Sequence, residues 1–427
     1  MTGPSGLHRE GPAAPSAAVI GTTSMALATT MTPAFLVGAL SATIGEDLDF
    51  DAAVTGTIVT AFYLVAALAA LPMGRFAERA GAGRSMRLGV LLSGLGCLVA
   101  ATLVTHWVQL LLIMAALGVT LPMVDTGAAR AFTTAVPSDR RGIAFGVKEA
   151  SVPAASMLAG LAVPLLAATV GWRLAFAGGV VVAPLILLGL RASLPPESGT
   201  RSGTARSGRF RRRSSRRIGA GAGGDTGAGD GLRETGGPQL RWSVRLLALS
   251  FALAGAAGAA VVTFLVPAAV SAGMTPAAGG TTLAAASLGG ISARLLAGLV
   301  ADRRPMLLGP VLILAMVLGA SGALGLASGL SGAGFVSVSI VTMTAGWGWT
   351  GLGFAALTRA VPHAPATAAG AGILGLALGG TLGPSTFGLL ASRNSFELGW
   401  AVVSVVFLLG ASCAYAGLRA DRFLATD

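Results

Sequence analysis

The sequence has 427 residues, of which 54% are hydrophobic and only 11% are charged, and its mean hydropathy is +0.78. A soluble domain needs far more charge to cover its surface, so this composition excludes a water-soluble globular protein. The formal net charge of +12 would suit a nucleic-acid binder, but the arginines that create it flank apolar segments or lie in one central stretch, which argues against nucleic acid as a partner.

Twelve apolar runs follow one another along the chain, each near the 20 residues that a helix needs to cross the hydrocarbon core. They cover residues 17–42, 53–73, 86–105, 108–134, 143–168, 174–191, 244–270, 277–300, 306–327, 333–358, 364–390 and 397–418. The runs are continuous, whereas a membrane β-barrel needs short segments of alternating hydrophobicity. We therefore predict an all-α membrane protein with twelve transmembrane helices. The first run is long enough to stay in the membrane, so no cleavable signal peptide is expected.

The arginines orient these helices. If the N-terminus is cytoplasmic, the inside segments hold 25 arginines and the outside loops hold only Arg173 and Arg393. Without the central stretch, 13 arginines are still inside and 2 outside, and the positive-inside rule therefore favours a cytoplasmic N-terminus. We expect a multi-pass protein of the cytoplasmic membrane, surrounded by lipid, with both termini in the cytoplasm.

The runs divide the chain into two halves of six helices. We predict a cytoplasmic tail at 1–16, a first half at 17–191, a disordered linker at 192–242, a second half at 243–418 and a tail at 419–427. The linker contains RFRRRSSRR at 209–217 and lacks apolar periodicity. Two interpretations are open. The linker is either a tether to nucleic acid or anionic lipid, or a flexible connector whose positive charge follows from its cytoplasmic location; we favour the connector.

Two landmarks recur at nearly the same offset. GRFAER follows the second run at 74–79, and GLVADR follows the eighth at 298–303, 224 residues later. Ala-Val-Pro follows the fourth run at 135–137 and the tenth at 360–362, 225 residues later. The second six helices therefore repeat the first six in the same orientation, an architecture of alternating-access transporters.

These segments resemble the loop signature of the major facilitator superfamily, whose usual form is G-x-L-a-D-r-x-G-r-r. GRFAERAGAGR at 74–84 and ISARLLAGLVADRR at 291–304 carry the matching positions, with Glu78 in place of the usual aspartate. The matching residues are Gly74, Glu78, Arg79 and Gly81 in the first half and Arg294, Gly298, Asp302 and Arg303 in the second. The resemblance covers essentially the whole chain. It implies two pseudo-symmetric six-helix bundles and a role for the signatures in latching a cytoplasmic gate; the alternative is that these charges only set topology.

Ionisable residues at membrane depth are functional candidates. Asp125 lies about eighteen residues after Trp107, and Lys148 lies seven residues after Arg141, roughly 10 Å at 1.5 Å per residue. We therefore predict similar depths on adjacent helices and an Asp125–Lys148 pair.

Lys148 is the only lysine in the sequence; the other 28 basic residues are arginines. Its ammonium could bind a carboxylate or take part in proton coupling. Alternatively, it could form a structural pair with Asp125 or Glu149, or its side chain could reach toward the membrane interface. Either Lys148 or Glu149 could be the protonatable group. Arg130, nearer the cytoplasmic end of its helix, fits a gate or a side chain that reaches toward the interface.

Among neutral residues, Trp347 and Trp349 lie near mid-membrane and Tyr63 lies mid-span in the second run. They could line a substrate cavity, with core packing as the alternative reading, and of two tryptophans two residues apart at most one can face the cavity. Gly370-x-Gly372-x-x-Gly375 matches a dinucleotide fingerprint but follows no strand. No nucleotide-binding loop, metal cluster or catalytic constellation is evident, so we expect no cofactor, no metal and no enzyme activity.

We predict a monomeric secondary transporter of a small organic solute, with an anion among the candidates, driven by protons or another gradient. A multidrug exporter of the same fold is the first alternative, although the fifth run carries SVPAASMLAG at 151–160 in place of the G-x-x-x-G-P signature of drug/proton antiporters. A non-transporting membrane sensor and an intramembrane enzyme are the alternatives from other classes.

Overall fold

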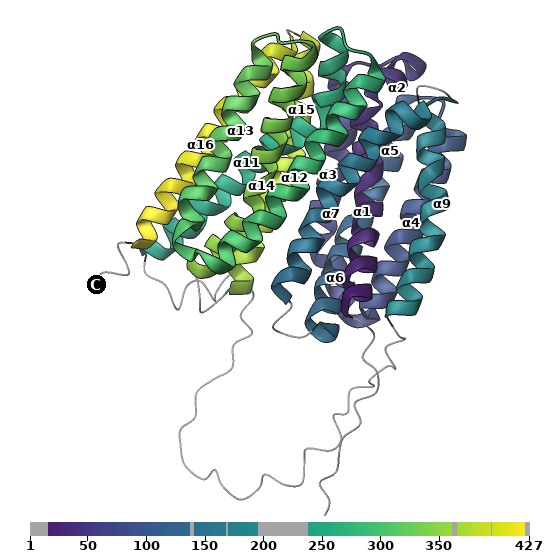
Figure 1. Ribbon diagram of the computed structural model, residues 1–427. Coiled ribbons are helices and arrows are strands. Elements are labelled where there is room, and N and C mark those ends of the chain that lie inside the picture. Colours follow the sequence, from purple (N-terminus) through teal and green to yellow (C-terminus); the bar gives the residue numbers. More distant parts are fainter. Residues whose placement is uncertain are drawn as a thin grey trace, which may run out of the picture.

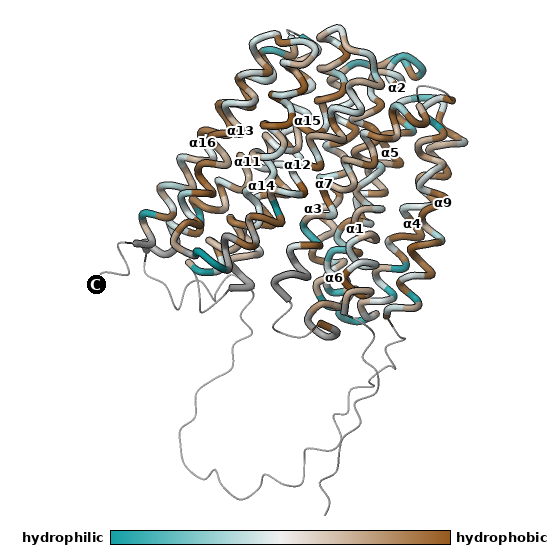
Figure 2. Tube along the Cα trace, viewed as in Figure 1, coloured by the Kyte–Doolittle hydropathy of each residue, from teal (hydrophilic) through white to brown (hydrophobic). Residues whose placement is uncertain are grey.

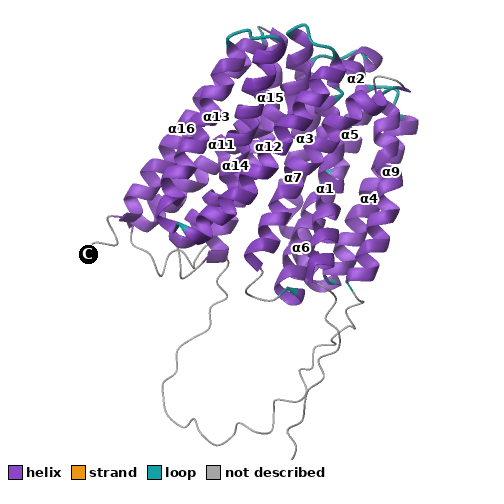
Figure 3. Cartoon of the chain, viewed as in Figure 1, coloured by secondary structure: helices purple, strands orange, loops and turns teal. Residues whose placement is uncertain are grey.

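The computed structural model describes residues 16–136, 141–167, 170–194, 238–360, 365–393 and 395–422. Within these ranges the chain is helical with short connecting loops and contains no strand, as Figure 3 shows. The predicted all-α class is confirmed. The N-terminal tail and most of the predicted linker lie outside the described residues.

The helices form two groups in chain order. The N-terminal half contains α1 (Ser16–Ala39), α2 (Ser41–Leu48), α3 (Ala52–Ala80), α4 (Ala82–Leu103), α5 (Trp107–Leu117), α6 (Thr120–Ala135), α7 (Arg141–Ala162), the π-helical turn η2 (Val163–Ala167) and α9 (Trp172–Ser193). The C-terminal half contains α11 (Pro238–Ser271), α12 (Pro276–Arg303), the short 3-10 turn η3 (Pro305–Leu307), α13 (Leu308–Ala327), α14 (Gly332–Ala360), α15 (Pro365–Arg393) and α16 (Phe396–Arg422).

Three boundaries differ from the sequence prediction. Helix α9 runs to Ser193 and α11 begins at Pro238, so helix extends into both ends of the range 192–242 that we expected to be linker. Proline suits the first turn of a helix because its φ is already helical and its missing N–H would have no partner there. The C-terminal tail likewise starts later than predicted, because α16 continues to Arg422.

The predicted span at 108–134 is broken into α5 and α6 around Gly118. Pro122 has no N–H to donate to the carbonyl of Gly118, which removes one bond of a continuous helix. A side chain at Gly118 would also lie 2.3 Å from the carbonyl oxygen of Phe62, so glycine permits the close approach of α3.

Ten helical segments among the described residues are long and apolar enough to cross a membrane, with α5 and α6 together forming one of them. The remaining two predicted spans are α12 and α14, which have 28 and 29 residues. They run beside the other helices (Figure 1), but polar and small side chains lower their hydropathy, so the count of twelve is confirmed only in part.

The bundle has two distinct ends. Helix α2 lies at one end, here called the α2 end, and the described chain starts and finishes at the other, as Figure 1 shows. Figure 2 shows hydrophobic residues along the helices and hydrophilic ones gathered mostly toward both ends. Large leucines face outward, among them Leu71 at 76% and Leu68 at 71% exposed, as expected for surfaces that lipid covers.

The two halves pack against each other through α3 with α15, α7 with α12 and α1 with α11. Glycines allow the backbones to touch: a side chain at Gly56 would lie 2.3 Å from the carbonyl oxygen of Pro384, and one at Gly160 would lie 2.7 Å from that of Gly280. The Oγ atoms of Ser156 and Ser287 also lie 2.8 Å apart across the α7–α12 contact. Small residues thus replace the large apolar side chains of a soluble core.

At the α2 end, Asp47 ties α2 to α9. Its Oδ2 accepts hydrogen bonds from Arg173 Nη1 at 2.6 Å and from Trp172 Nε1 at 3.0 Å. The Arg173 bond, helped by the Trp172 bond, holds the pKa of the Asp47 carboxyl below its usual value of 3.8. Asp47 and Arg173 remain nearly half exposed, so the pair contributes modestly to stability.

We predict that Asp47→Asn lowers the free energy of unfolding by roughly 0.2–1 kcal/mol at neutral pH. Because the folded state holds this carboxyl ionised to lower pH than the unfolded state does, its contribution is complete above about pH 4 and is lost as the pH falls through the folded-state pKa. Thermal unfolding of the purified protein between pH 3 and 7, with Arg173→Gln and the double variant, tests this. An Asp47→Asn deficit that does not shrink in acid would contradict it.

Candidate functional site

Four charged side chains meet inside the bundle, on α6, α7 and α12. Lys148 Nζ lies 2.6 Å from Asp125 Oδ1 on α6 and 3.2 Å from Glu149 Oε1 beside it on α7. Lys148 is only 7% exposed, and a buried ammonium is tolerated when carboxylates pair with it. The pairing of Asp125 with Lys148 that residue counting predicted is therefore present in the structure.

Glu149 extends the cluster into the other half. Its Oε2 lies 3.8 Å from Arg294 Nη1 on α12, and its backbone carbonyl accepts a hydrogen bond from the same guanidinium. Arg294 is 7% exposed and also donates from Nε to the carbonyl oxygen of Trp347 at 3.1 Å. The four charges, two acidic and two basic, thus form a neutral chain from the N-terminal half to the C-terminal half. We call Asp125, Lys148, Glu149 and Arg294 the charge cluster.

Arg294 lies deeper in the bundle than the end of the second signature. The family signature groups Arg294 with gate residues, and α12 continues beyond it to Arg303, nine residues or about 14 Å further. Glu149 lies eight residues after the start of α7 at Arg141, at nearly the same depth. The nearly equal spacings of eight and nine residues from these two helix ends were a signal in the sequence that could have paired Glu149 with Arg294.

Trp347 lies beside this cluster and Trp349 does not. The Trp347 ring centroid is 6.0 Å from that of Phe35 on α1 and 5.3 Å from Arg294 Cζ, so Trp347 packs between the halves. Trp349 packs within the C-terminal half, 4.9 Å from the ring of Phe251 on α11. Of the two tryptophans, only Trp347 faces the other half, and the sequence did not indicate its partner Phe35.

Tyr63 contacts the opposite half at a different place. A Cβ at Gly380 on α15 would lie 3.0 Å from Tyr63 Cδ1, so the tyrosine ring fills the space that the glycine leaves. The ring also makes an edge contact with Phe62, with centroids 5.4 Å apart. Tyr63 therefore belongs to the α3–α15 contact and is not among the residues that touch the charge cluster.

The first signature lies at the turn between α3 and α4. Gly81 has φ of +88°, a conformation that glycine adopts without strain. Glu78 and Arg79 are exposed, and the carbonyl oxygen of Glu78 accepts a hydrogen bond from Arg130 Nη1 at 3.0 Å. Gly74 approaches Thr126 of α6, so these described contacts lie within the N-terminal half and not across to the other.

The second signature ends α12. Arg303 is exposed in its last turn. The side-chain surroundings of Gly298 and Asp302 lie outside what the structure describes, so the predicted latch stays a prediction. Among the described residues, no group of three or more His, Cys, Asp or Glu side chains could hold a metal ion.

The chain is similar to known membrane proteins over nearly its full length. The model of the Major Facilitator Superfamily matches residues 18–384. Two solved structures of a bacterial homolog to the human lysosomal transporter Spinster share the fold. The inward-facing, occupied form has a TM-score of 0.69 and 16% identity over 96% of this chain and 98% of that one. The inward-facing, unoccupied form has 0.64 and 15% over 96% and 97%. No curated protein matches the sequence.

We predict that Lys148→Met destabilises the protein more than Asp125→Asn does, because it leaves Asp125 and Glu149 without the cation that separates them. Removing one member of a buried pair costs roughly 3–5 kcal/mol, and less for Asp125, whose side chain is 33% exposed. The double variant should lose less than the sum of the single losses. Thermal unfolding in detergent measures this, with Glu78→Gln as the exposed control; additive losses would contradict direct coupling.

Proposed function

The chain belongs to the Major Facilitator Superfamily, a family of membrane transporters, and from that premise we propose that it moves a small organic anion by alternating access, driven by a proton gradient. The observation that carries the proposal is the charge cluster, which joins α6 and α7 to α12 across the contact between the halves. Ion pairs at membrane depth are expensive, and functional sites are where they are retained.

The cluster supplies two cations that a carboxylate or phosphate can engage. Lys148 and Arg294 are each held by carboxylates, and a solute anion could replace Asp125 or Glu149 as their partner provided that the displaced carboxylate takes up a proton, which keeps the cluster neutral. Trp347 beside Arg294 offers an apolar face for the organic part of the solute. This favours an anion over a neutral or cationic solute.

The ion pair between Glu149 and Arg294 also offers a carboxylate that a proton can neutralise during the transport cycle. In an alternating-access cycle, α7 and α12 separate at the level of Glu149 and Arg294 in one of the two states. Separation is costly while Glu149 is ionised, and protonation of Glu149 or capture of Arg294 by the solute lowers that cost. Coupling follows when both events are required: capture of Arg294 by the solute leaves the Glu149 carboxylate without a cation, and a proton on Glu149 then removes the unpaired charge.

Orientation and surroundings complete the proposal. We place the protein in the cytoplasmic membrane as a monomer with both termini in the cytoplasm, from the arginine distribution, so the α2 end faces outward. We also place the segment between α9 and α11, most of which lies outside the described residues, on the cytoplasmic side as a connector, and Glu78, Arg79, Asp302 and Arg303 at the cytoplasmic gate.

The test begins with a ligand screen. We expect small carboxylates or phosphate esters to raise the unfolding temperature of the purified protein, and the active compounds to cross proteoliposome membranes when a pH gradient is imposed. Binding without flux would support a sensor instead, and stabilisation only by apolar cations would favour the multidrug exporter.

We predict that Lys148→Ala abolishes flux of the solute found in this way while expression is retained, since the cluster then lacks one cation. Lys148→Arg is the matched control: it keeps the charge but not the compact ammonium, and it should retain solute binding better than alanine does. Thermal-shift titration and initial flux rates measure both effects. Unchanged flux in Lys148→Ala would remove Lys148 from the mechanism.

We also predict that a disulfide between α7 and α12 stops transport reversibly. Ser156→Cys with Ser287→Cys places two thiols where the hydroxyl oxygens lie 2.8 Å apart, within the reach of a disulfide. In a background with Cys97 and Cys413 replaced by serine, oxidation should abolish flux and a reductant should restore it, while neither single variant responds. Transport that continues in the cross-linked protein would show that these helices do not separate during the cycle.

A further inference from the structure

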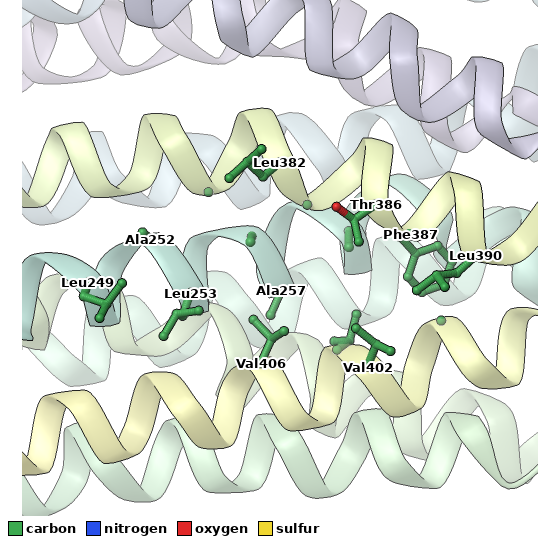
Figure 4. Close-up of a pocket in the computed structure, with 16 residues that line it drawn as sticks. Leu249, Ala252, Leu253, Ala257, Leu382, Thr386, Phe387, Leu390, Val402 and Val406 are labelled. Carbon is green, nitrogen blue, oxygen red and sulfur yellow. The ribbon is translucent and has the colours of Figure 1, made fainter.

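A groove of about 300 Å³ lies within the C-terminal half, between α11, α15 and α16 and apart from the charge cluster. Figure 4 shows Leu382, Thr386 and Leu390 of α15 along one side of it and Val402 and Val406 of α16 along the other, with α11 between them. Thr386 is the only polar side chain among the lining residues; the others are aliphatic, glycine or phenylalanine.

Small residues create this groove. Gly379 and Gly383 bring α15 into backbone contact with α11, where a Cβ would lie 2.3 Å from the carbonyl oxygen of Ala252 and 2.1 Å from that of Ala256. The two alanines then have too little side chain to fill the space beside the contact. Because Leu382 is 61% and Leu249 is 48% exposed, the groove opens on the surface that faces lipid.

A cation stands at one mouth of the groove. Arg393, in the last turn of α15, follows Leu382, Thr386 and Leu390 by eleven, seven and three residues, which places it on the same face of the helix at 100° per residue. Its side chain is exposed and makes no ion pair among the described residues. Glu397, the nearby acidic residue, lies about 180° from the groove-lining Val406 on α16 and so faces away.

Thr386 adds a free donor inside the groove. Neighbouring hydroxyls on α15 bond to carbonyl oxygens of the preceding turn, as Thr381 does at 2.8 Å and Ser385 at 3.1 Å. The hydroxyl of Thr386 makes no such bond within the described part of the chain. A hydroxyl in an apolar groove, about two turns from an arginine, matches a ligand with a long apolar tail, an acyl carbonyl and an anionic head.

We propose that this groove binds one acyl chain of an anionic membrane phospholipid, with the phosphate at Arg393 and the acyl ester near Thr386. The lining residues along α11, from Leu249 to Ala260, extend about 16 Å, or half the hydrocarbon core. Arg245 stands one turn beyond Leu249 at the opposite mouth, but its guanidinium stacks over Trp242 at 5.7 Å. The head group therefore lies at the Arg393 end.

The lipid has a route to influence transport. Helix α15 packs against α11 on the groove side and against α3 of the other half. An acyl chain held between α11, α15 and α16 therefore stabilises the packing of α15 within the C-terminal half, and α15 is the helix that contacts α3 of the N-terminal half.

Native mass spectrometry of the full-length protein in detergent tests this site, with phosphatidylglycerol titrated against phosphatidylcholine of the same chains. We expect one molecule of phosphatidylglycerol to bind more tightly than phosphatidylcholine. Arg393→Gln should reduce that preference about five-fold, the contribution expected of one basic residue at an anionic membrane surface. Leu253→Phe with Val402→Phe, which fill the groove, should weaken binding of both lipids.

Matched controls separate the alternatives. Arg245→Gln, at the opposite mouth, and Leu314→Phe, on the lipid-exposed face of α13, should leave the preference and the affinity unchanged. The proposal is overturned if Arg393→Gln binds like the wild type, if Arg245→Gln removes the preference instead, or if groove filling breaks a dimer without displacing lipid. The last result would assign the groove to a helix of a second copy.

Discussion

Burial of charge away from water is the constraint on which this structure depends. The two buried cations of the charge cluster, Lys148 and Arg294, each lose several kcal/mol of hydration, and only close pairing returns it. Asp125, Lys148, Glu149 and Arg294 meet this requirement as a neutral chain in which the basic and acidic groups alternate along the path. Because the last pair joins α7 to α12, the electrostatic balance of each half depends on the position of the other.

The remainder of the contact between the halves is suited to movement. Glycines on α3, α7, α12 and α15 let backbones touch, and single hydroxyl contacts such as Ser156–Ser287 hold them in register. Such surfaces contain few interlocking large side chains, so a change of contact breaks few specific interactions. The charge cluster is the exception, and it is therefore the place where a solute or a proton can decide between two states.

Much of the fold could be predicted from residue order alone. Apolar runs near the length of a membrane crossing gave the helices, and repeated landmarks at offsets of 224 and 225 divided them into two like halves. Counting 1.5 Å per residue placed Asp125 and Lys148 at one depth, and the structure pairs them. The break at Gly118 and Pro122 and the early start of α11 were missed, because a hydropathy run does not register a single lost backbone bond or a proline-led first turn.

The sequence by itself therefore determined the order and approximate lengths of the helices and the spacing of charged residues along them, since these depend on distances along the chain. Only the tertiary structure decided which helices are neighbours and which way each side chain points. The packing of α12 on α7 places Arg294 beside Glu149, and the rotation of α14 about its axis points Trp347 toward Phe35 of the other half and Trp349 toward Phe251. The packing of small residues between helices sets which helices are adjacent and which face each one presents. That packing brings together residues too far apart in sequence for any local pattern to connect.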